Sequence, residues 1–303
     1  MEISVVIPSY NTQDSIEKTL QHLVQQKISI MYEIIVVDCS EHYKVKKIVH
    51  HINQFFPNLR YVYRHNRFNP GEGRNIGAWE ARGKLLVFVD ADVLLAPSSL
   101  QAAWNHFKSG KQIYGGALEL NANVNNNLAS YLEHYFFNHE SQKGRPACER
   151  KNLSSALLLF DKDVFIKEGG FKDIPRMQDT ELTERLRKHG YHLYFCPDVL
   201  AFQTQNTPLS KVLKKIYISG QNTYYIRYQT SISLLKKIAF FIGLPLLSIF
   251  KIGRIIIRHL CYQTPGGKLI TLVISLPLII SSWYWMGGFY NALITEKGIG
   301  AER

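Results

Sequence analysis

Three short apolar runs constrain the fold of this 303-residue chain more than any other feature. Residues 3–8, 33–38 and 84–90 are rich in β-branched residues, and each run ends in Pro or Asp. Apolar runs without polar alternation are typical of strands that are buried on both faces of a parallel sheet. Between the first two runs, apolar residues recur at helical spacing over residues 16–24, which predicts a βαβ unit.

The chain continues this alternation to about residue 205. Further segments have the pattern of helices or strands, namely helices over 72–81, 98–109 and 179–190, and strand-like runs over 153–160 and 191–197. We therefore expect an α/β fold with a mostly parallel, doubly wound sheet in a domain that covers residues 1–206.

The composition changes after this domain. The segment 207–236 begins with a helix that has apolar residues on one face and lysines on the other, as in helices that lie on a membrane surface. Two long apolar stretches follow, 238–257 and 269–290, and the second is long enough to cross a bilayer. We therefore expect a membrane region over 237–303, with one span or two spans as the alternatives.

The charge of the chain calls for an anionic partner. The formal net charge is +12 at pH 7, which suits nucleic acid, anionic lipid or a phosphorylated substrate. Because many of the cations flank the apolar stretches, lipid headgroups explain them better than nucleic acid does. Met1 leads directly into the first apolar run without a signal-peptide pattern, so we expect a cell-membrane protein whose domain 1–206 is cytoplasmic. The four cysteines form no CxxC pair, so no zinc site or disulfide framework is expected.

Two carboxylates follow the strand-like run 84–90. Asp90 and Asp92 are two residues apart, so in an extended segment they point the same way and can bind one Mg²⁺ or Mn²⁺ ion. They would lie at the carboxyl edge of the sheet, where open α/β sheets bind ligands. The alternative is that one Asp caps the next helix or lies in solvent.

Polar residues also follow the first two runs and should reach the same edge. Tyr10 can stack on a nucleotide base, while Asp38 can accept a hydrogen bond from the base. A capping or turn role for Asp38 is the alternative.

The glycine-rich stretch 69–77 has the spacing GxGxxxG, which fits a dinucleotide-binding fingerprint poorly. We interpret it as a turn that opens a helix whose N-terminus, with Arg74, faces a diphosphate. The alternative is an ordinary surface cation.

In this order, VVIPSYN, VVDCS, NPGEGRNIGAWEARGKLLVFVDADV and GGFKDIPRMQDTELTERLRKHGY resemble family 2 glycosyltransferases with the GT-A fold. The resemblance runs from about residue 3 to 203 and implies an inverting transfer from a nucleoside diphosphate sugar, with UDP as the expected nucleotide. It also implies site residues: Pro8, Tyr10 and Asn11 beside the nucleoside, Asp38 on the base, Arg74 near it, Asp90 on the ribose or the metal, and Asp92 on Mg²⁺ or Mn²⁺.

The resemblance further implies that Asp179 is the general base, which takes the proton of the acceptor hydroxyl. A helix cap is the alternative, because an Asp in a first turn stabilises the helix. The chain departs from the family pattern twice: Gln178 replaces the usual first acid, and Gln203 stands where many relatives have a metal-binding His. An amide oxygen is a weaker ligand than imidazole, which bears on metal affinity.

Membrane attachment favours a lipid, a lipid-linked glycan or a polysaccharide as the acceptor. Two other functions compete with this interpretation. A catalytically inactive nucleotide-sugar-binding or scaffold protein would not need the three acids Asp90, Asp92 and Asp179. A nucleotidyltransferase would share the sheet and the metal, but not a base placed as Asp179 is.

Overall fold

The computed structural model describes residues 1–174, 177–228 and 232–296. Parts of the predicted segments 207–236 and 237–303 therefore lie outside the described residues. The chain forms two compact units. Unit 1 comprises residues 1–121, 145–173 and 178–204, and unit 2 comprises residues 122–144, 174–177 and 205–303.

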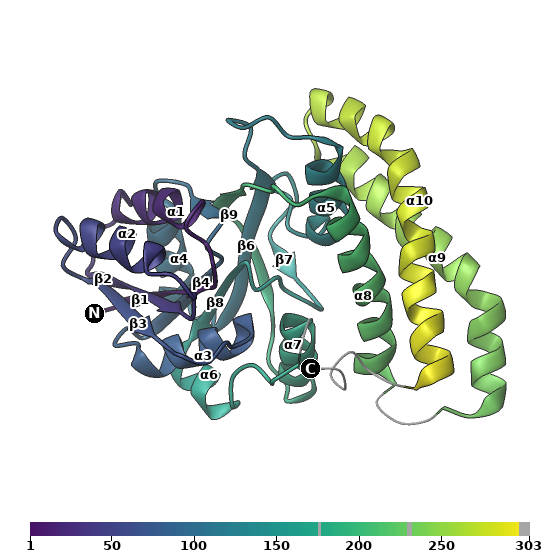
Figure 1. The fold of residues 1–303 in the computed structure, drawn as a ribbon, viewed down its shortest axis with the longest axis horizontal. Coiled ribbons are helices and arrows are strands. Elements are labelled where there is room, and N and C mark those ends of the chain that lie inside the picture. The colour runs from purple at the N-terminus through teal and green to yellow at the C-terminus, as the bar shows by residue number, and fades with distance from the viewer. Residues whose placement is uncertain (175–176, 229–231, 297–303) are drawn as a thin grey trace. The chain divides into compact units, whose positions relative to one another are not determined.

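Unit 1 is built on one mixed sheet, coloured purple to teal in Figure 1. In the described residues the sheet has nine strands: β1 (Ile3–Ser9), β2 (Tyr32–Asp38), β3 (Leu59–Tyr63), β4 (Leu85–Val89), β5 (Val93–Leu95), β6 (Ile113–Leu120), β7 (Cys148–Glu149), β8 (Leu157–Asp161) and β9 (Tyr194–Gln203). Their order is β3-β2-β1-β4-β8-β6-β9-β5, and β7 pairs with β9.

The first half of the sheet is parallel, as the apolar runs predict. Strand β1 pairs in parallel with β2 and β4, and β2 pairs in parallel with β3. In the second half, β8 is antiparallel to both β4 and β6. The predicted α/β fold with a mostly parallel sheet is thus confirmed, with an antiparallel strand that the apolar run 153–160 did not reveal. The reason is that an apolar run carries no information about direction.

Helices cover both faces of this sheet. Helices α1 (Ile16–Val24), α2 (Lys44–Asn53) and α4 (Ser99–Lys108) bury apolar residues on one face, and α3 (Pro70–Glu80), α6 (Lys162–Lys167) and α7 (Gln178–Lys188) bury theirs on the other (Figure 1). Helix α3 begins where the sequence provides a start: Pro70 is its first residue, and the side chain of Asn69 accepts a hydrogen bond from the Glu72 N–H. A Cβ atom on Gly77 would lie 2.2 Å from Val6, so only glycine lets this helix approach β1 so closely.

Unit 2 consists of four helices within the described residues: α5 (Leu128–Asn138), α8 (Leu209–Arg227), α9 (Leu234–Tyr262) and α10 (Pro265–Thr295). Helices α9 and α10 are long and apolar enough to cross a membrane, and they contain the predicted stretches 238–257 and 269–290.

Helix α8 does not present a free apolar face. Its buried residues, among them Val212 and Ile216, join one cluster with residues of α5, α9 and α10. The backbones of α8 and α10 cross closely, because a Cβ atom on Gly220 would lie 2.0 Å from the carbonyl oxygen of Trp285. Small residues allow such close crossings of apolar helices.

Helix α5 belongs to unit 2, although it lies within the segment 1–206 that the sequence assigns to one domain. The aromatic side chains of Tyr135 and Phe136 are buried in the cluster shared with α8, α9 and α10. The tertiary packing of an aromatic helix, rather than its position in the chain, decides this membership.

Candidate active site at the carboxyl edge of the sheet

Asp38 ends β2 and is fully buried. Its carboxylate accepts four hydrogen bonds: Oδ1 from the Ser9 hydroxyl (2.8 Å), the Ser40 hydroxyl (2.6 Å) and the Ser40 N–H (3.2 Å), and Oδ2 from the Tyr61 hydroxyl (2.7 Å). Burial and the hydrogen bond to Asp38 raise the pKa of Tyr61, so this hydroxyl stays protonated as a donor. Asp38 is thus held firmly, with three donors on Oδ1 and one on Oδ2.

The loop after β1 carries Tyr10 and Asn11 and is fixed by the same network. Asn11 has a φ of +53°, a left-handed conformation that Asn tolerates, and its N–H donates to the Ser40 hydroxyl (2.8 Å). The Tyr10 ring lies 4.4 Å beneath the guanidinium of Arg67, and its hydroxyl donates to Glu41 (3.2 Å). An aromatic ring stacked with a cation at this edge provides a flat surface suited to a base.

Pro8 belongs to the last part of β1 and faces helix α3. A Cβ atom on Gly73 would lie 3.0 Å from the Pro8 Cβ and 2.6 Å from the Phe68 ring. The predicted nucleoside-side residue Pro8 therefore also fixes how closely the N-terminus of α3 approaches the site edge.

Arg74 and Asp90 form a partly buried ion pair. The distance from Arg74 Nη2 to Asp90 Oδ1 is 2.5 Å, and the Arg74 side chain is only 3% exposed. Arg74 Nε is buried and has no hydrogen-bond partner among the described residues. An unpaired buried donor costs free energy unless a ligand supplies an acceptor, so the geometry suits an anionic ligand beside Asp90.

Asp92 lies next to Gln203, the residue that stands in the place of a histidine. Strand β5 pairs with the end of β9, and the Gln203 amide nitrogen lies 3.3 Å from one Asp92 carboxylate oxygen. A half-turn of the Gln203 amide would point Oε1 to the place where Nε2 now lies, so either atom can face a ligand of Asp92.

These residues fit a divalent metal through their donor chemistry. Within the described ranges, no three His, Cys, Asp or Glu side chains gather as a metal site. However, the oxygen of Asp90 that Arg74 does not use, the Asp92 carboxylate and the Gln203 amide oxygen are all hard ligands. Mg²⁺ and Mn²⁺ sites of nucleotide enzymes use few protein oxygens and complete their shell with phosphate and water.

Asp179 lies in the first turn of α7. Its Oδ2 accepts a hydrogen bond from the Ser155 N–H (3.2 Å), and its Oδ1 accepts one from the N–H of Thr180 (2.8 Å). The next residue after Ser155, Ala156, accepts a hydrogen bond from the Asp90 N–H through its carbonyl (3.3 Å). One short segment therefore connects Asp179 to Asp90, so the structure brings these two predicted site residues to the same edge.

Gln178 has a role that sequence reasoning missed. Its side-chain amide is buried and donates to Asn69 Oδ1 (2.6 Å), the atom that also caps α3. Asn69 in turn donates to Asp173 (2.5 Å). The amide of Gln178 therefore joins the helix that carries Asp179 to the start of the helix that carries Arg74.

The partners of Asp38 were also missed. Ser9 and Ser40 stand beside residues that the motifs single out, while Tyr61 is on β3, for which no strand was predicted. Alternation in LRYVY places Tyr61 and Tyr63 on one face, and their rings stack at 6.5 Å. That alternation is the only signal in the sequence that pointed to Tyr61.

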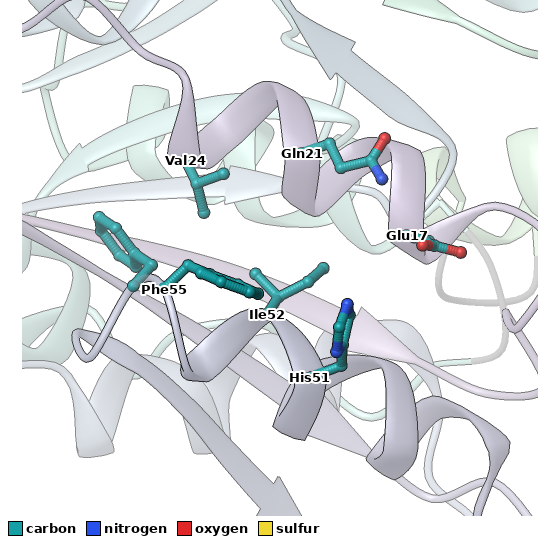
Figure 2. Close-up of a pocket in the computed structure, with 7 residues that line it drawn as sticks. Glu17, Gln21, Val24, His51, Ile52 and Phe55 are labelled. Atoms are coloured by element: carbon teal, nitrogen blue, oxygen red, sulfur yellow. The ribbon is translucent and has the colours of Figure 1, made fainter.

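A pocket of about 320 Å³ lies elsewhere in unit 1 (Figure 2). Figure 2 shows Gln21 and Val24 from α1 facing Ile52 from α2 and Phe55 just after this helix. This pocket lies between two helices on one face of the sheet. It contains none of the predicted site residues.

Comparison with known proteins gives matches that cover this site. The family model described as Glycosyl transferase family 2 matches residues 4–169. Among curated proteins, the glycosyltransferase AglE of Haloferax volcanii is 25% identical over 236 residues, which are 77% of this chain and 76% of AglE. A poly(ribitol-phosphate) beta-glucosyltransferase of Bacillus spizizenii is 33% identical over 114 residues, which are 37% of this chain and 18% of that protein.

Solved structures share the fold. A mannosyltransferase of Pyrobaculum calidifontis, solved with GDP-Man and Mn²⁺, aligns with a TM-score of 0.63 at 14% identity. The alignment covers 98% of this chain and 88% of the mannosyltransferase chain. Residues 1–349 of Staphylococcus aureus TarS, solved with UDP-GlcNAc, align with a TM-score of 0.56 at 14% identity, over 98% of this chain and 91% of that one. At these identities the likeness is one of fold.

Proposed function

The chain belongs to glycosyl transferase family 2 and is a glycosyltransferase, and we propose that it transfers a sugar from a nucleoside diphosphate sugar to a hydroxyl group with inversion at the anomeric carbon. In this proposal residues 1–206 form the catalytic domain, and residues 207–303 attach it to a membrane. Helix α5 lies within the catalytic segment of the chain but packs in unit 2. Two apolar helices, α9 and α10, support the membrane attachment.

One observation carries the proposal: three acids lie along the carboxyl edge of the sheet, and a short segment links two of them. Asp90 and Asp92 follow β4, and the segment Ser155–Ala156 links Asp90 to Asp179 by hydrogen bonds. A scaffold protein has no need of this arrangement, and a nucleotidyltransferase has no need of the third acid. An inverting transfer needs all three, because the leaving diphosphate and the attacking hydroxyl are on opposite sides of the anomeric carbon.

Each acid has a distinct role in the proposed reaction. Asp92, with Asp90 and Gln203, would hold a Mg²⁺ or Mn²⁺ ion, which when bound supplies positive charge for the departing diphosphate. Asp179 accepts the proton of the acceptor hydroxyl as its oxygen forms the bond to the anomeric carbon. The bond from that carbon to the diphosphate oxygen breaks, and its electron pair leaves with the diphosphate.

Arg74 positions Asp90 and faces the donor. Its Nη2 holds one carboxylate oxygen of Asp90, which orients the other for a ligand, and its unpaired Nε can donate to a diphosphate or ribose oxygen. The other nucleoside contacts proposed are Tyr10 stacking on the base, with Pro8 and Asn11 beside it.

UDP is the nucleotide we propose, as in the TarS complexes with UDP and UDP-GlcNAc. Asp38 would accept the imide N–H of uracil. Its Oδ2 accepts a hydrogen bond from the Tyr61 hydroxyl alone, so this oxygen has a lone pair left for the imide donor. The mannosyltransferase with bound GDP-Man makes GDP the competing choice.

A lipid, a lipid-linked glycan or a polysaccharide is the proposed acceptor, and the cytoplasmic side of the cell membrane is the proposed location of the catalytic domain. Poly(ribitol-phosphate) transferases among the relatives support a glycan-like acceptor. Membrane helices support an acceptor that is itself at the membrane.

A donor screen tests the proposal. The purified full chain is incubated with UDP- and GDP-sugars, with and without Mn²⁺, and slow donor hydrolysis and thermal protection are both measured. We expect one nucleotide class to be protected and hydrolysed only with metal, and NMR should show a product whose anomeric configuration is opposite to that of the donor. Retention, or hydrolysis that is unaffected by metal chelation, would overturn the mechanism.

A further inference from the structure

Arg150 is a cation of unit 1 that the proposed transfer does not use. It follows β7, and its backbone N–H donates to the Leu193 carbonyl (2.8 Å), which fixes the start of the segment between β7 and β8. Its side-chain nitrogens Nε and Nη2 are buried and have no hydrogen-bond partner in the part of the chain that the structure describes. Buried donors in folded proteins nearly always have a partner, so these two nitrogens call for one.

Other partly buried arginines of this unit are paired with carboxylates. Arg60 lies 3.2 Å from a carboxylate oxygen of Glu33, and Arg185 lies 3.0 Å from one of Glu181. Arg150, by contrast, has no carboxylate within 4.0 Å among the described residues. The described residues therefore leave the charge of Arg150 to be balanced by a ligand.

The ring of Phe195 orients the guanidinium of Arg150. The guanidinium carbon lies 4.9 Å from the centre of this ring, and Phe195 is only 2% exposed. A ring face attracts a cation, but it carries no net charge and offers no acceptor to N–H groups that point outward in the guanidinium plane. The contact therefore holds Arg150 in place and leaves Nε and Nη2 for a ligand.

The two unpaired nitrogens are the pair that suits an anion with two oxygens. In a guanidinium, the Nε–H and one N–H of Nη2 point the same way, so they can donate two parallel hydrogen bonds to one ligand. Phosphates and carboxylates offer two oxygens at the matching separation, whereas a neutral sugar hydroxyl offers one. The donor chemistry of Arg150 therefore favours a phosphate or a carboxylate.

The segment that begins with Arg150 runs along helix α7 beside Asp179. The Ser155 N–H donates to Asp179 Oδ2 (3.2 Å), and Asn152 Oδ1 accepts a bond from the hydroxyl of Thr183, one turn further along α7 (3.3 Å). Because five residues span at most about 18 Å, the Cα atom of Arg150 lies within that distance of the Cα atom of Ser155. An acceptor bound at Asp179 can therefore extend to Arg150.

The contacts along this segment indicate which reactant carries the anion. Ala156 contacts Asp90, Ser155 contacts Asp179, and the residues before them contact the next turn of α7. The segment thus leads from an acid proposed for the metal and the diphosphate, past the proposed base, to Arg150. In an inverting transfer the acceptor approaches from the side opposite the diphosphate, so an anion at Arg150 belongs to the acceptor.

We propose that Arg150 binds an anionic group of the acceptor, a phosphate or a carboxylate, through Nε and Nη2. This inference rests on the proposed glycosyl transfer and narrows its acceptor to a molecule that carries negative charge near the reacting hydroxyl. Arg150 is a binding residue in this reaction and takes no part in proton transfer.

The test is a binding measurement on the full chain in nonionic detergent, without any sugar donor. Three probes are titrated by calorimetry: glycerol 3-phosphate, glucuronate and glycerol. Each titration is done with and without UDP and Mn²⁺, so that an anion bound in the donor site is recognised by its competition with UDP. We expect at least one of the two anions to bind roughly tenfold more tightly than glycerol, also when UDP is present.

Matched variants separate a defined site from diffuse attraction. Arg150→Met removes the charge and both donors, while an unbranched side chain still covers Phe195. Lys151→Met removes the same charge from the next residue, which is exposed. We expect the Kd of the anion to be weaker by roughly tenfold or more for Arg150→Met and by less than about twofold for Lys151→Met. Arg150→Lys keeps the charge but not the paired donors, so its Kd should lie between those of the wild type and Arg150→Met.

Each outcome decides the proposal. Binding of glycerol 3-phosphate that depends on Arg150 assigns the acceptor's anion to a phosphate, and such binding of glucuronate assigns it to a carboxylate. Equal losses in Arg150→Met and Lys151→Met would overturn the proposal, as would anion binding that UDP abolishes or the binding of neither anion to the wild type.

Thermal unfolding without ligand checks that Arg150→Met is folded, and Arg150→Lys provides the test if it is not. The measurement requires no transfer, so it is distinct from the donor screen. A donor screen without any hydrolysis, together with anion binding that depends on Arg150, would refute the proposed transfer but not the anion site.

Discussion

The two units of the molecule treat buried polar groups differently. In unit 1, fully buried Asp38 accepts four hydrogen bonds, and Glu33, at 1% exposure, accepts bonds from Ser4 and from the Arg82 N–H. In unit 2, His134 Nε2 and Ser248 Oγ are buried without a hydrogen-bond partner among the described residues. Hydrogen bonds thus fix Asp38 and Glu33 in unit 1, whereas these two polar atoms of unit 2 are buried without one.

This difference has a physical origin. Strand ends place donors and acceptors of neighbouring strands at one edge, so unit 1 can hold charged groups for chemistry. Apolar helices have their backbone groups satisfied internally and gain stability from close packing, here at Gly220 and Gly288. Changes to charge should therefore affect unit 1 most, and changes to shape should affect unit 2 most.

The largest effect expected is that of Asp92→Asn. Loss of a metal-ligand charge should lower transfer activity by a factor on the order of 10³ or more. Circular dichroism and the unfolding of unit 2 should be unchanged. Asp198→Asn serves as a control, because Asp198 is exposed and pairs with His106. Near-normal activity of Asp92→Asn in excess Mg²⁺ or Mn²⁺ would show that the metal assignment is wrong.

Asp179→Asn should reduce turnover by a factor on the order of 10² to 10⁴, the usual contribution of a general base. Donor affinity should stay the same, because the amide oxygen can still accept the Ser155 N–H. Single-turnover kinetics and a donor titration separate the two quantities. A parallel loss of donor affinity would indicate that Asp179 is a helix cap.

Gly288→Ala tests the part that shape plays in unit 2. The new Cβ atom would lie 1.9 Å from the Tyr217 carbonyl oxygen, so α8 and α10 must separate, at a cost of about 3 kcal/mol. Gly287→Ala is the matched control, since its Cβ atom would meet the Tyr217 ring at an ordinary 3.5 Å. The unfolding temperature should fall only for Gly288→Ala, while the donor affinity of unit 1 should stay unchanged. Equal unfolding temperatures for the two variants would refute the close crossing.

Acid should weaken unit 2 through its buried histidines, and His134 is one of them. Burial and the neighbouring His259 lower the pKa of His134 to about 3, so the unfolded chain binds a proton below pH 6.5 that the folded chain does not bind. The free energy of unfolding is therefore highest above pH 6.5 and decreases as the pH falls toward 3. At pH 5 the decrease amounts to about 2 kcal/mol. Urea unfolding at pH 7 and pH 5 measures it.

The histidine is identified by its variants. His134→Gln should have a smaller difference in unfolding free energy between pH 7 and pH 5 than the wild type. The same substitution at His50, which is exposed on α2, should leave the difference as it is in the wild type. If His134→Gln keeps the full dependence, another group is responsible.

The smallest expected effect is that of Gln178→Glu. A carboxylate in place of the amide would face Asn69 Oδ1, another acceptor, and would bring negative charge next to Asp179. We expect turnover to fall by about tenfold and the acidic limb of the pH–rate profile to move to higher pH. Gln21→Glu, at an exposed position of α1 far along the chain from the predicted site residues of α7, is the control. An unchanged profile would mean that Gln178 only fills space.

Much of the catalytic unit could be predicted from local patterns. The apolar runs located β1, β2 and β4, and the polar residues after them identified Asp38, Asp90 and Asp92 as edge residues. These predictions succeed because a strand's burial and its end are encoded within a few consecutive residues. The long apolar helices α9 and α10 were found for the same reason.

Contacts between distant residues were not predictable. Gln178 and Asn69 are separated by 109 positions. Tyr61 donates to Asp38 from β3, a strand that was not predicted from the sequence. The antiparallel direction of β8 and the packing of α5 in unit 2 also depend on contacts between distant residues and were not predicted.

The sequence by itself therefore determined which elements form and which side chains stand at their ends, because hydrophobic periodicity and strand ends are local properties of the chain. Only the tertiary structure decided which of these ends meet. It paired Arg74 with Asp90, placed Gln203 beside Asp92, and brought the Lys251 ammonium over the rings of Phe136 and Trp285. The physical reason is that such contacts depend on how whole helices and strands pack, and packing is a property of the complete fold.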